Sequence, residues 1–143
     1  VVFGSRFKKK DAYKQGMPMW KYIANIFLTF IENKIFGLKL TEYHTGYRAF
    51  RRNVLEKVNF LVNSDDFIFD QQIVAQIIDI KSRISEVYVP AKYFPEASSV
   101  GFLRSCVYGL KIIVLLLEYV LYKLKFIKPI RYSIPSDRYY KFK

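Results

Sequence analysis

The chain has 143 residues, with 24 lysines or arginines against 12 aspartates or glutamates, which gives a net charge of +12. A chain of this length suits one domain that buries about two thirds of the surface exposed by the unfolded chain. The charge and the 18% aromatic content predict an anionic partner, either a membrane surface, a nucleic acid or a phosphorylated substrate. The single cysteine, Cys106, excludes a disulfide or a cysteine-based metal cluster within this chain.

The first residues predict the end of a strand that leads into a ligand-binding loop. Residues 1 to 3 are apolar and favour a strand, and Gly4, Ser5 and Arg6 follow them directly. In open α/β sheets, ligands usually bind at the carboxyl ends of strands. Arg6 is therefore a candidate for binding phosphate. The alternative is an arginine in a basic surface loop together with the lysines at 8 to 10.

Residues 18 to 36 are predicted to form one amphipathic helix that begins near Pro18 and ends at Gly37. Apolar residues recur at three- and four-residue spacing, at Trp20, Ile23, Ala24, Phe27, Phe30, Ile31 and Ile35. The polar side carries Lys21, Asn25, Thr29 and Glu32. The apolar face is wider than one core contact needs, which predicts packing on two sides or contact with lipid.

Residues 41 to 50 combine a turn with reactive side chains. Gly46 permits a turn or a close approach to a ligand. Around it, Glu42, His44, Thr45, Tyr47 and Arg48 offer a carboxylate, an imidazole, hydroxyls and a guanidinium. The planar donor fork of Arg48 suits phosphate. An ordinary loop that leads from one element into a short strand at Tyr47 is the alternative interpretation.

Residues 63 to 81 predict a second helix. Ser64, Asp65 and Asp66 provide capping side chains, and an apolar stripe follows at helical spacing. Asp70 falls near the beginning of this helix, where the helix dipole favours a carboxylate. Asp70 could act as a general base, or it could simply cap the helix.

Residues 83 to 94 predict an extended segment that adds a strand beside the Tyr47 strand. Glu86 within it is expected to be structural. The following loop, 95 to 100, contains the adjacent hydroxyls of Ser98 and Ser99, which suit either an acceptor phosphate or an ordinary turn.

The segment from 102 to 126 is apolar almost all round, yet Arg104, Lys111, Glu118 and Lys125 recur every seven residues along one stripe. Such spacing predicts a helix that docks on a membrane surface and does not cross it. From residue 101 onward the chain has nine lysines or arginines but only two acidic residues, Glu118 and Asp137. Anionic headgroups would attract this excess of positive charge. Burial under a partner is the alternative.

Residues 42 to 50, Glu-x-x-Thr-Gly-Tyr-Arg-Ala-Phe, resemble the Asp-x-x-Ser/Thr-Gly-Phe/Tyr-Arg-Ala-Phe segment of family 2 glycosyltransferases of the dolichyl-phosphate mannose synthase type. Further pieces resemble the second half of that family in the same order: Gly-Ser-Arg at 4 to 6, Met-Pro-Met-Trp-Lys at 17 to 21, Phe-Asp at 69 and 70, Glu-Val-Tyr-Val-Pro at 86 to 90 and Ser-Ser-Val at 98 to 100. The resemblance covers roughly residues 1 to 110.

This resemblance implies an α/β chain in which residues 1 to 100 are the acceptor-side half of a GT-A-like domain and residues 101 to 143 are a membrane-associating tail. It implies an enzyme that moves a sugar from a nucleotide sugar to an acceptor, with a polyisoprenyl phosphate expected, at the cytoplasmic face of the membrane. In the family an amino-terminal Asp-x-Asp motif holds the donor and Mg²⁺ or Mn²⁺. The chain contains no Asp-x-Asp. We therefore expect an inactive fragment whose donor and metal sites lie in the missing half.

The resemblance also assigns roles to residues. Asp70 or Glu42 would be the base for a hydroxyl acceptor, whereas an anionic phosphate oxygen hardly needs one. Glu42 replaces the family's more usual Asp. The acceptor is expected to contact Ser5, Arg6, His44, Thr45, Gly46, Arg48, Ser98 and Ser99.

Two functions of another class compete with this hypothesis. One is a non-catalytic basic module or scaffold that binds a membrane. The other is nucleic-acid binding, which the sequence disfavours because the aromatic residues follow helical core spacing and do not alternate as they do in base-stacking strands. A cheap test is to search the upstream reading frame for an Asp-x-Asp.

Overall fold

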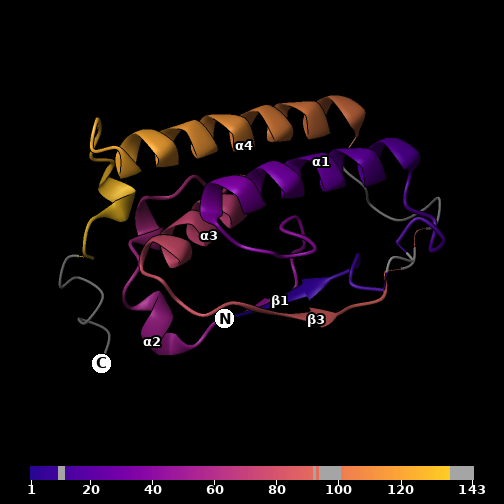
Figure 1. Ribbon diagram of the computed structural model, residues 1–143, viewed down its shortest axis with the longest axis horizontal. Helices are drawn as coiled ribbons and strands as arrows, with labels where there is room; N and C mark the ends of the chain where they lie inside the picture. The colour runs from indigo at the N-terminus through magenta and orange to yellow at the C-terminus, as the bar shows by residue number, and fades with distance from the viewer. Residues whose placement is uncertain (10–11, 92, 94–100, 136–143) are drawn as a thin grey trace.

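The structure, a computed structural model, describes residues 1–9, 12–91, 93 and 101–135 (Figure 1). Its elements in chain order are the strand β1 (Val2–Ser5), helix α1 (Met19–Phe36), strand β2 (Arg48–Ala49), helices α2 (Arg52–Leu55) and α3 (Phe69–Asp79), strand β3 (Ser85–Tyr88) and helix α4 (Phe102–Lys123), with 3₁₀ turns at Phe60–Val62 and Ile130–Tyr132. The predicted α/β class is confirmed as a small fold in which helices pack on a three-stranded mixed sheet.

Strand β1 is the central strand of the sheet, whose order is β2-β1-β3. It pairs with β2 in antiparallel fashion and with β3 in parallel. Gly4 permits this close packing, because a Cβ there would lie 2.7 Å from a Val89 methyl carbon and 2.8 Å from the Cβ of Tyr47. The prediction of a strand within 83 to 94 is confirmed, but its expected neighbour is wrong, since β3 pairs with β1 and not with β2.

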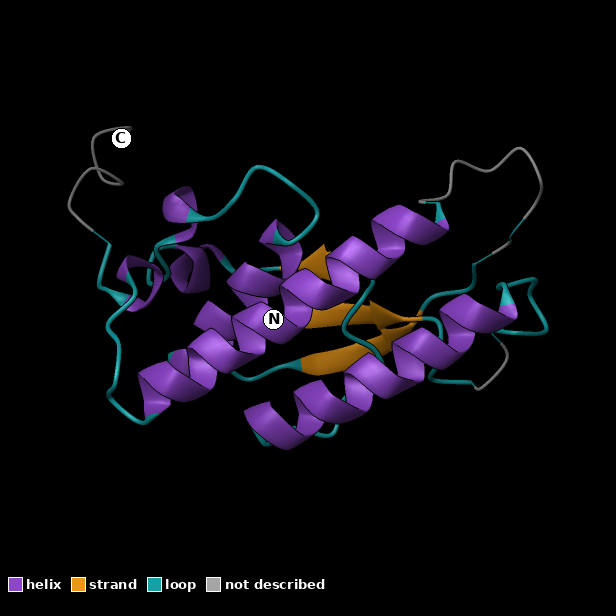
Figure 2. Cartoon of the chain, turned by 90° about the horizontal axis from the view of Figure 1, so that it is seen from above, coloured by secondary structure: helices purple, strands orange, loops and turns teal. Residues whose placement is uncertain are grey.

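Helices α1 and α4 lie side by side above the sheet and run in the same direction (Figures 1 and 2). Near their beginnings the rings of Trp20 and Phe102 are 5.2 Å apart. Near their ends the rings of Phe36 and Tyr119 are 5.1 Å apart. The main core lies beneath this pair and contains Phe3, Phe36, Tyr43, Val74, Ala75, Ile112, Leu116 and Tyr119. Segment 101–135 therefore packs into the same core as the sheet.

Helix α1 has the predicted extent, and Gly37 ends it in the left-handed conformation with φ 69°. It buries polar as well as apolar residues: Leu28, Ile31 and Ile35 pack against the main core. The polar residues Thr29 and Glu32 are buried, whereas Phe27 and Phe30 are each 59% exposed. A large part of the wide apolar face therefore lies at the molecular surface.

The exposed apolar side chains of α1 and α4 form what we call the apolar helix surface. It comprises Met19, Ile23, Ile26, Phe27 and Phe30 of α1 and Phe102, Leu103, Val107, Leu110, Val114, Leu117 and Leu121 of α4. Within the described residues, α4 is the one helix that is long and apolar enough to cross a membrane, with a mean hydropathy of 1.7. The core helix of a soluble protein can pass the same test, so this is weak evidence of membrane association.

Candidate functional site

A cavity of about 270 Å³ lies where α1, the segment 44–46, the beginning of α3 and α4 meet. Its wall contains Arg6, Trp20, Lys21, Ala24, Asn25, Leu28, His44, Thr45, Gly46, Phe67, Asp70, Ser105 and Tyr108. The structure thus brings Arg6, His44, Thr45, Gly46 and Asp70, all predicted from the sequence, to one cavity. Ser5, Glu42 and Arg48 are not part of its wall. Ser98 and Ser99 lie outside the described residues.

Arg6 is held in place by Glu42. The Arg6 backbone N–H donates to Oε2 of Glu42 at 2.7 Å and Nε donates to Oε1 at 2.8 Å, while Nη2 also contacts Oε1. Nη1 donates to the Tyr93 hydroxyl at 2.6 Å. Burial opposes the charge of Arg6, but the hydrogen bonds and charge of Glu42 outweigh it and raise the pKa of the guanidinium. Glu42 is fully buried, so its oxygens serve Arg6 beneath the cavity.

The carboxylate of Glu86 fixes the loop that contains Thr41 and Glu42. Oε1 of Glu86 accepts hydrogen bonds from the backbone N–H groups of Thr41 and Glu42 and from the Thr41 hydroxyl, at 2.8, 3.1 and 2.9 Å. The Ser5 hydroxyl lies 2.6 Å from that of Thr41. Glu86 therefore has the structural role predicted for it, and Ser5 helps to position the loop.

Arg48 is buried behind the cavity wall, with 3% of its side chain exposed. Nη2 donates to the Tyr43 carbonyl at 2.6 Å, and Nη1 donates to the Asp70 carbonyl. Its guanidinium also lies 5.0 Å from the centre of the Phe3 ring. Burial lowers the pKa of Arg48 despite the opposing charge of Asp70. The guanidinium of Arg48, which was expected to bind phosphate, therefore joins the backbone at Tyr43 to the beginning of α3.

Asp70 lies in the first turn of α3, as predicted, and 49% of its side chain is exposed. Its Oδ1 is 3.6 Å from Nη1 of Arg48. Asp70 is therefore an accessible carboxylate at the edge of the cavity, and its oxygens can accept a hydrogen bond or a proton there.

Sequence reasoning missed the role of Lys21. This lysine lines the cavity beside Arg6, and no carboxylate pairs with it within the described part of the chain. Burial, and to a lesser degree the charge of Arg6, lowers the pKa of Lys21. Because Glu42 compensates Arg6, Lys21 carries the uncompensated positive charge of this cavity. The signal in the sequence was the polar line 21, 25, 29 and 32 on an otherwise apolar helix.

His44 is enclosed between α1 and α4. Its Nδ1 lies 2.8 Å from Oδ1 of Asn25, and its Nε2 lies 3.2 Å from Oε2 of Glu32. The ring of Tyr108 meets the imidazole edge-on, with the centres 6.1 Å apart. Burial raises the pKa of Tyr108 to about 12, so its hydroxyl stays protonated near neutral pH. The sequence identified His44 but gave no sign of its partners.

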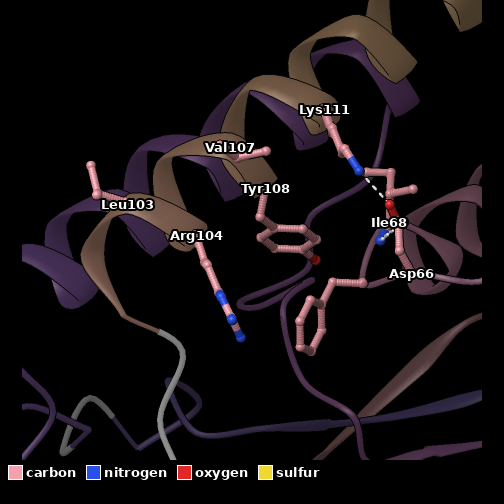
Figure 3. A pocket seen from close by; sticks show the side chains of 8 residues that line it. Asp66, Ile68, Leu103, Arg104, Val107, Tyr108 and Lys111 are labelled. Carbon is pink, nitrogen blue, oxygen red and sulfur yellow. Dashed lines mark hydrogen bonds and ion pairs between the residues drawn. The ribbon is translucent and has the colours of Figure 1, made fainter.

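A second, mostly apolar cavity of about 250 Å³ adjoins the first and shares Phe67 and Tyr108 with it. Figure 3 shows Arg104 extending from α4 beside Tyr108, and Lys111 bonded to Asp66. The hydrogen bond from Lys111 is the main cause that lowers the pKa of Asp66. Leu103 and Val107 belong both to this cavity and to the apolar helix surface. A polar cavity and a mostly apolar cavity therefore lie next to each other.

Among the described residues, no group of three or more histidine, cysteine, aspartate or glutamate side chains could hold a metal ion. Comparison with known proteins found no matching family model, no matching curated protein and no matching solved structure.

Proposed function

We propose that this chain provides the acceptor site of a membrane-associated family 2 glycosyltransferase, with a polyisoprenyl phosphate as acceptor. The observation that carries the proposal is the position of the cavity. Its cationic side chains Arg6 and Lys21 lie beneath the apolar helix surface, next to the carboxylate of Asp70. A ligand with an anionic head and an apolar tail matches that arrangement. The ordered resemblance of residues 1 to 110 to this family supports the reaction class.

The two cations would hold the phosphate in different ways. Glu42 and Tyr93 fix the guanidinium of Arg6, so binding costs little side-chain entropy there. Lys21 has no carboxylate partner within the described residues, so its ammonium gains a counter-charge when an anion enters. An ammonium and a phosphate oxygen in a partly buried site attract each other more strongly than in bulk water.

In the proposed reaction an oxygen of the acceptor attacks the anomeric carbon of the nucleotide sugar. A carbon–oxygen bond forms, the bond to the nucleotide diphosphate breaks, and the diphosphate leaves with the electron pair. A phosphate acceptor is already an anion and requires no proton transfer. A sugar hydroxyl would have to lose a proton, and Asp70 is the accessible carboxylate in the cavity wall that could take it. The donor and its Mg²⁺ or Mn²⁺ are outside this proposal.

The membrane would be contacted by both long helices. Phe27 and Phe30 of α1 and Leu110 and Val114 of α4 are among the exposed side chains that would enter the interface between headgroups and acyl chains. Exposed basic residues after α4, including Lys125 and Lys128, would meet anionic headgroups at the cytoplasmic face. The same surface also favours the second candidate, a membrane-binding module without catalysis.

The experiment that separates these functions is a binding assay in lipid nanodiscs. The chain is titrated with geranyl phosphate and, as the matched control, with geraniol. We expect the phosphate ester to bind at least about tenfold more tightly, because a charged hydrogen-bonded contact contributes about 1.5–3 kcal/mol. Equal affinity for ester and alcohol would contradict an acceptor-phosphate site and leave membrane binding as the function.

A further inference from the structure

Three cavities follow one another along α4. The polar cavity shares Phe67 and Tyr108 with the mostly apolar cavity of about 250 Å³. That apolar cavity shares Ile68, Val107 and Lys111 with a third cavity of about 350 Å³. We call the second and third cavities together the α4 groove. Because neighbouring cavities have wall residues in common, the α4 groove continues the polar cavity along the helix.

One wall of the α4 groove is a row of apolar residues on α4 itself. Leu103 and Val107 line its first part, and Val107, Leu110 and Val114 line its second part. Figure 3 shows Leu103 and Val107 on successive turns of the helix. Each of these four side chains is more than half exposed and belongs to the apolar helix surface. A chain lying in the groove would therefore contact protein on one side and lipid on the other.

The rest of the α4 groove offers little unpaired polar surface. Ile68 and Leu115, which line it, are buried. The polar side chains beside them are paired with one another, Ser64 with Gln72, Asp66 with Lys111 and Glu118 with Arg131. An apolar ligand would not leave these groups without a partner, and that loss is the usual cost of covering polar groups. The groove therefore suits an apolar chain.

The charges place the head of such a ligand at one end. Arg6 and Lys21 line the polar cavity, and Arg104 lines the adjoining part of the α4 groove (Figure 3). In the far part of the groove, the cation Arg131 is already paired with Glu118. An anionic head in the polar cavity would thus direct its apolar tail into the α4 groove.

The length of the α4 groove limits how much of a tail it can hold. Leu103 and Val114 lie eleven residues apart on α4, which corresponds to about 16 Å at the helical rise of about 1.5 Å per residue. Three covalent bonds of an extended peptide span about 3.8 Å, so the four chain bonds of one isoprene unit span about 5 Å. The groove therefore has room for about three isoprene units.

We propose that the α4 groove binds the isoprene units of the acceptor that lie next to its phosphate, about three of them, and leaves the remainder of the tail to the bilayer. This inference rests on the proposed function, because it assumes that the anionic head occupies the polar cavity. The ion pair between Lys111 and Asp66 joins α4 to the opposite wall partway along the groove, so both walls are in place before the tail enters.

The test locates the tail by photolabelling. The chain in phosphatidylcholine nanodiscs is exposed to geranyl phosphate and to farnesyl phosphate, each with a diazirine in its last isoprene unit, and mass spectrometry identifies the labelled residues. We expect the geranyl probe to label the groove around Val107 and the farnesyl probe to label it around Leu110 and Val114. The matching alcohols lack the phosphate and should label the apolar helix surface without this order.

Val114→Trp fills the far part of the groove at a position whose side chain is exposed, so the fold tolerates the larger ring. Farnesyl phosphate should bind this variant about three- to tenfold more weakly, because the bilayer also dissolves the tail and only packing in the groove is lost. Geranyl phosphate is too short to reach Val114 and should bind unchanged. Leu117→Trp, at an exposed residue of α4 outside the groove walls, is the matched control and should change neither affinity.

Two results would overturn the groove alone. One is labelling of Phe27 and Phe30 on α1 by the farnesyl phosphate probe in place of Leu110 and Val114. The other is an equal loss of affinity for both esters in Val114→Trp, or no loss for either. In these cases a preference for the phosphate ester over its alcohol would leave the proposed function intact. Equal affinity for ester and alcohol would overturn both the groove and the proposed function.

Discussion

The carboxylate of Glu42 holds Arg6 at three points, through the backbone N–H at 2.7 Å, through Nε at 2.8 Å and through Nη2. Because Glu42 is fully buried, its removal leaves a largely enclosed guanidinium without a counter-charge. We expect Glu42→Gln to lower the free energy of unfolding by about 3 kcal/mol, which urea denaturation measures. Glu56→Gln, in an exposed pair, should cost less than about 1 kcal/mol. If both variants lose a similar free energy of unfolding, the buried pair of Arg6 and Glu42 stabilises the fold no more than an exposed pair does.

Lys21 is predicted to bind the anion directly. Lys21→Met keeps much of the apolar stem and removes the ammonium, so the affinity for geranyl phosphate should fall about tenfold or more. Isothermal titration calorimetry in nanodiscs is the measurement. Lys34→Met changes an exposed lysine on the same helix and outside the cavity, and it should leave the affinity unchanged. An equal loss in both variants would indicate only a general attraction of the anion to positive charge.

The apolar helix surface predicts membrane binding by both helices. Phe27→Asp on α1 and Leu110→Asp on α4 should each weaken flotation with anionic liposomes by about tenfold or more, because burial of such a side chain contributes about 1.5–3 kcal/mol. Tyr47→Asp introduces the same charge at a 70% exposed aromatic residue outside this surface and should have little effect. High salt should weaken binding of the unmodified chain without abolishing it. If only the α4 variant has an effect, α1 is not part of the docking surface.

Alkaline pH should destabilise the fold through Tyr108. Burial raises the pKa of Tyr108 to about 12, above the value of about 10 in an unfolded chain. The stabilisation is therefore complete below about pH 10 and is lost as the pH rises toward 12, by up to about 1.4 kcal/mol per pH unit. We expect the free energy of unfolding, measured in urea at several pH values between about 10 and 12, to fall less steeply with pH in Tyr108→Phe than in the unmodified chain. Tyr47→Phe controls for the loss of a hydroxyl, and a slope that Tyr108→Phe leaves unchanged would assign the effect to other groups.

In the full-length enzyme that the proposed function implies, Asp70→Asn distinguishes the two acceptor classes in a sugar-transfer assay. With a polyisoprenyl phosphate, kcat/KM should change little, because the attacking oxygen is already an anion. With a sugar hydroxyl, loss of the base should lower kcat/KM about 10²-fold or more. A large loss with the phosphate acceptor would show that Asp70 has a role other than taking a proton.

The sequence predicted the position of most elements, because local signals mark them. Pro18 and Gly37 bracket α1, and the apolar residues at 1 to 3 and within 83 to 94 mark the strands. The order of the strands could not be predicted in this way, because no local sequence signal indicates that β3 pairs with β1. The close approach at Gly4 that permits both neighbours involves Tyr47 and Val89, which are distant in sequence.

The side of α1 that faces the interior could not be read from periodicity. A hydrophobic stripe marks one face, but a membrane surface and a protein core favour the same residues there. The buried side carries Glu32 as well as Leu28, Ile31 and Ile35, and His44, which Glu32 and Asn25 approach, lies in another segment. Arg48 shows the same limitation, because its fork suits phosphate and carbonyl oxygens equally well, and only the fold places Tyr43 and Asp70 within its reach.

The equal direction of α1 and α4 has a consequence for the order of folding. Antiparallel helices can be joined by a short turn, whereas the contact between Trp20 and Phe102 spans 82 residues of sequence. Contacts of such high sequence separation form late, because the entropy of closing the intervening loop must be overcome first. As a ribosome releases the chain, α1 is complete long before α4 emerges. Its exposed phenylalanines are therefore accessible to other molecules before the neighbouring helix has been synthesised.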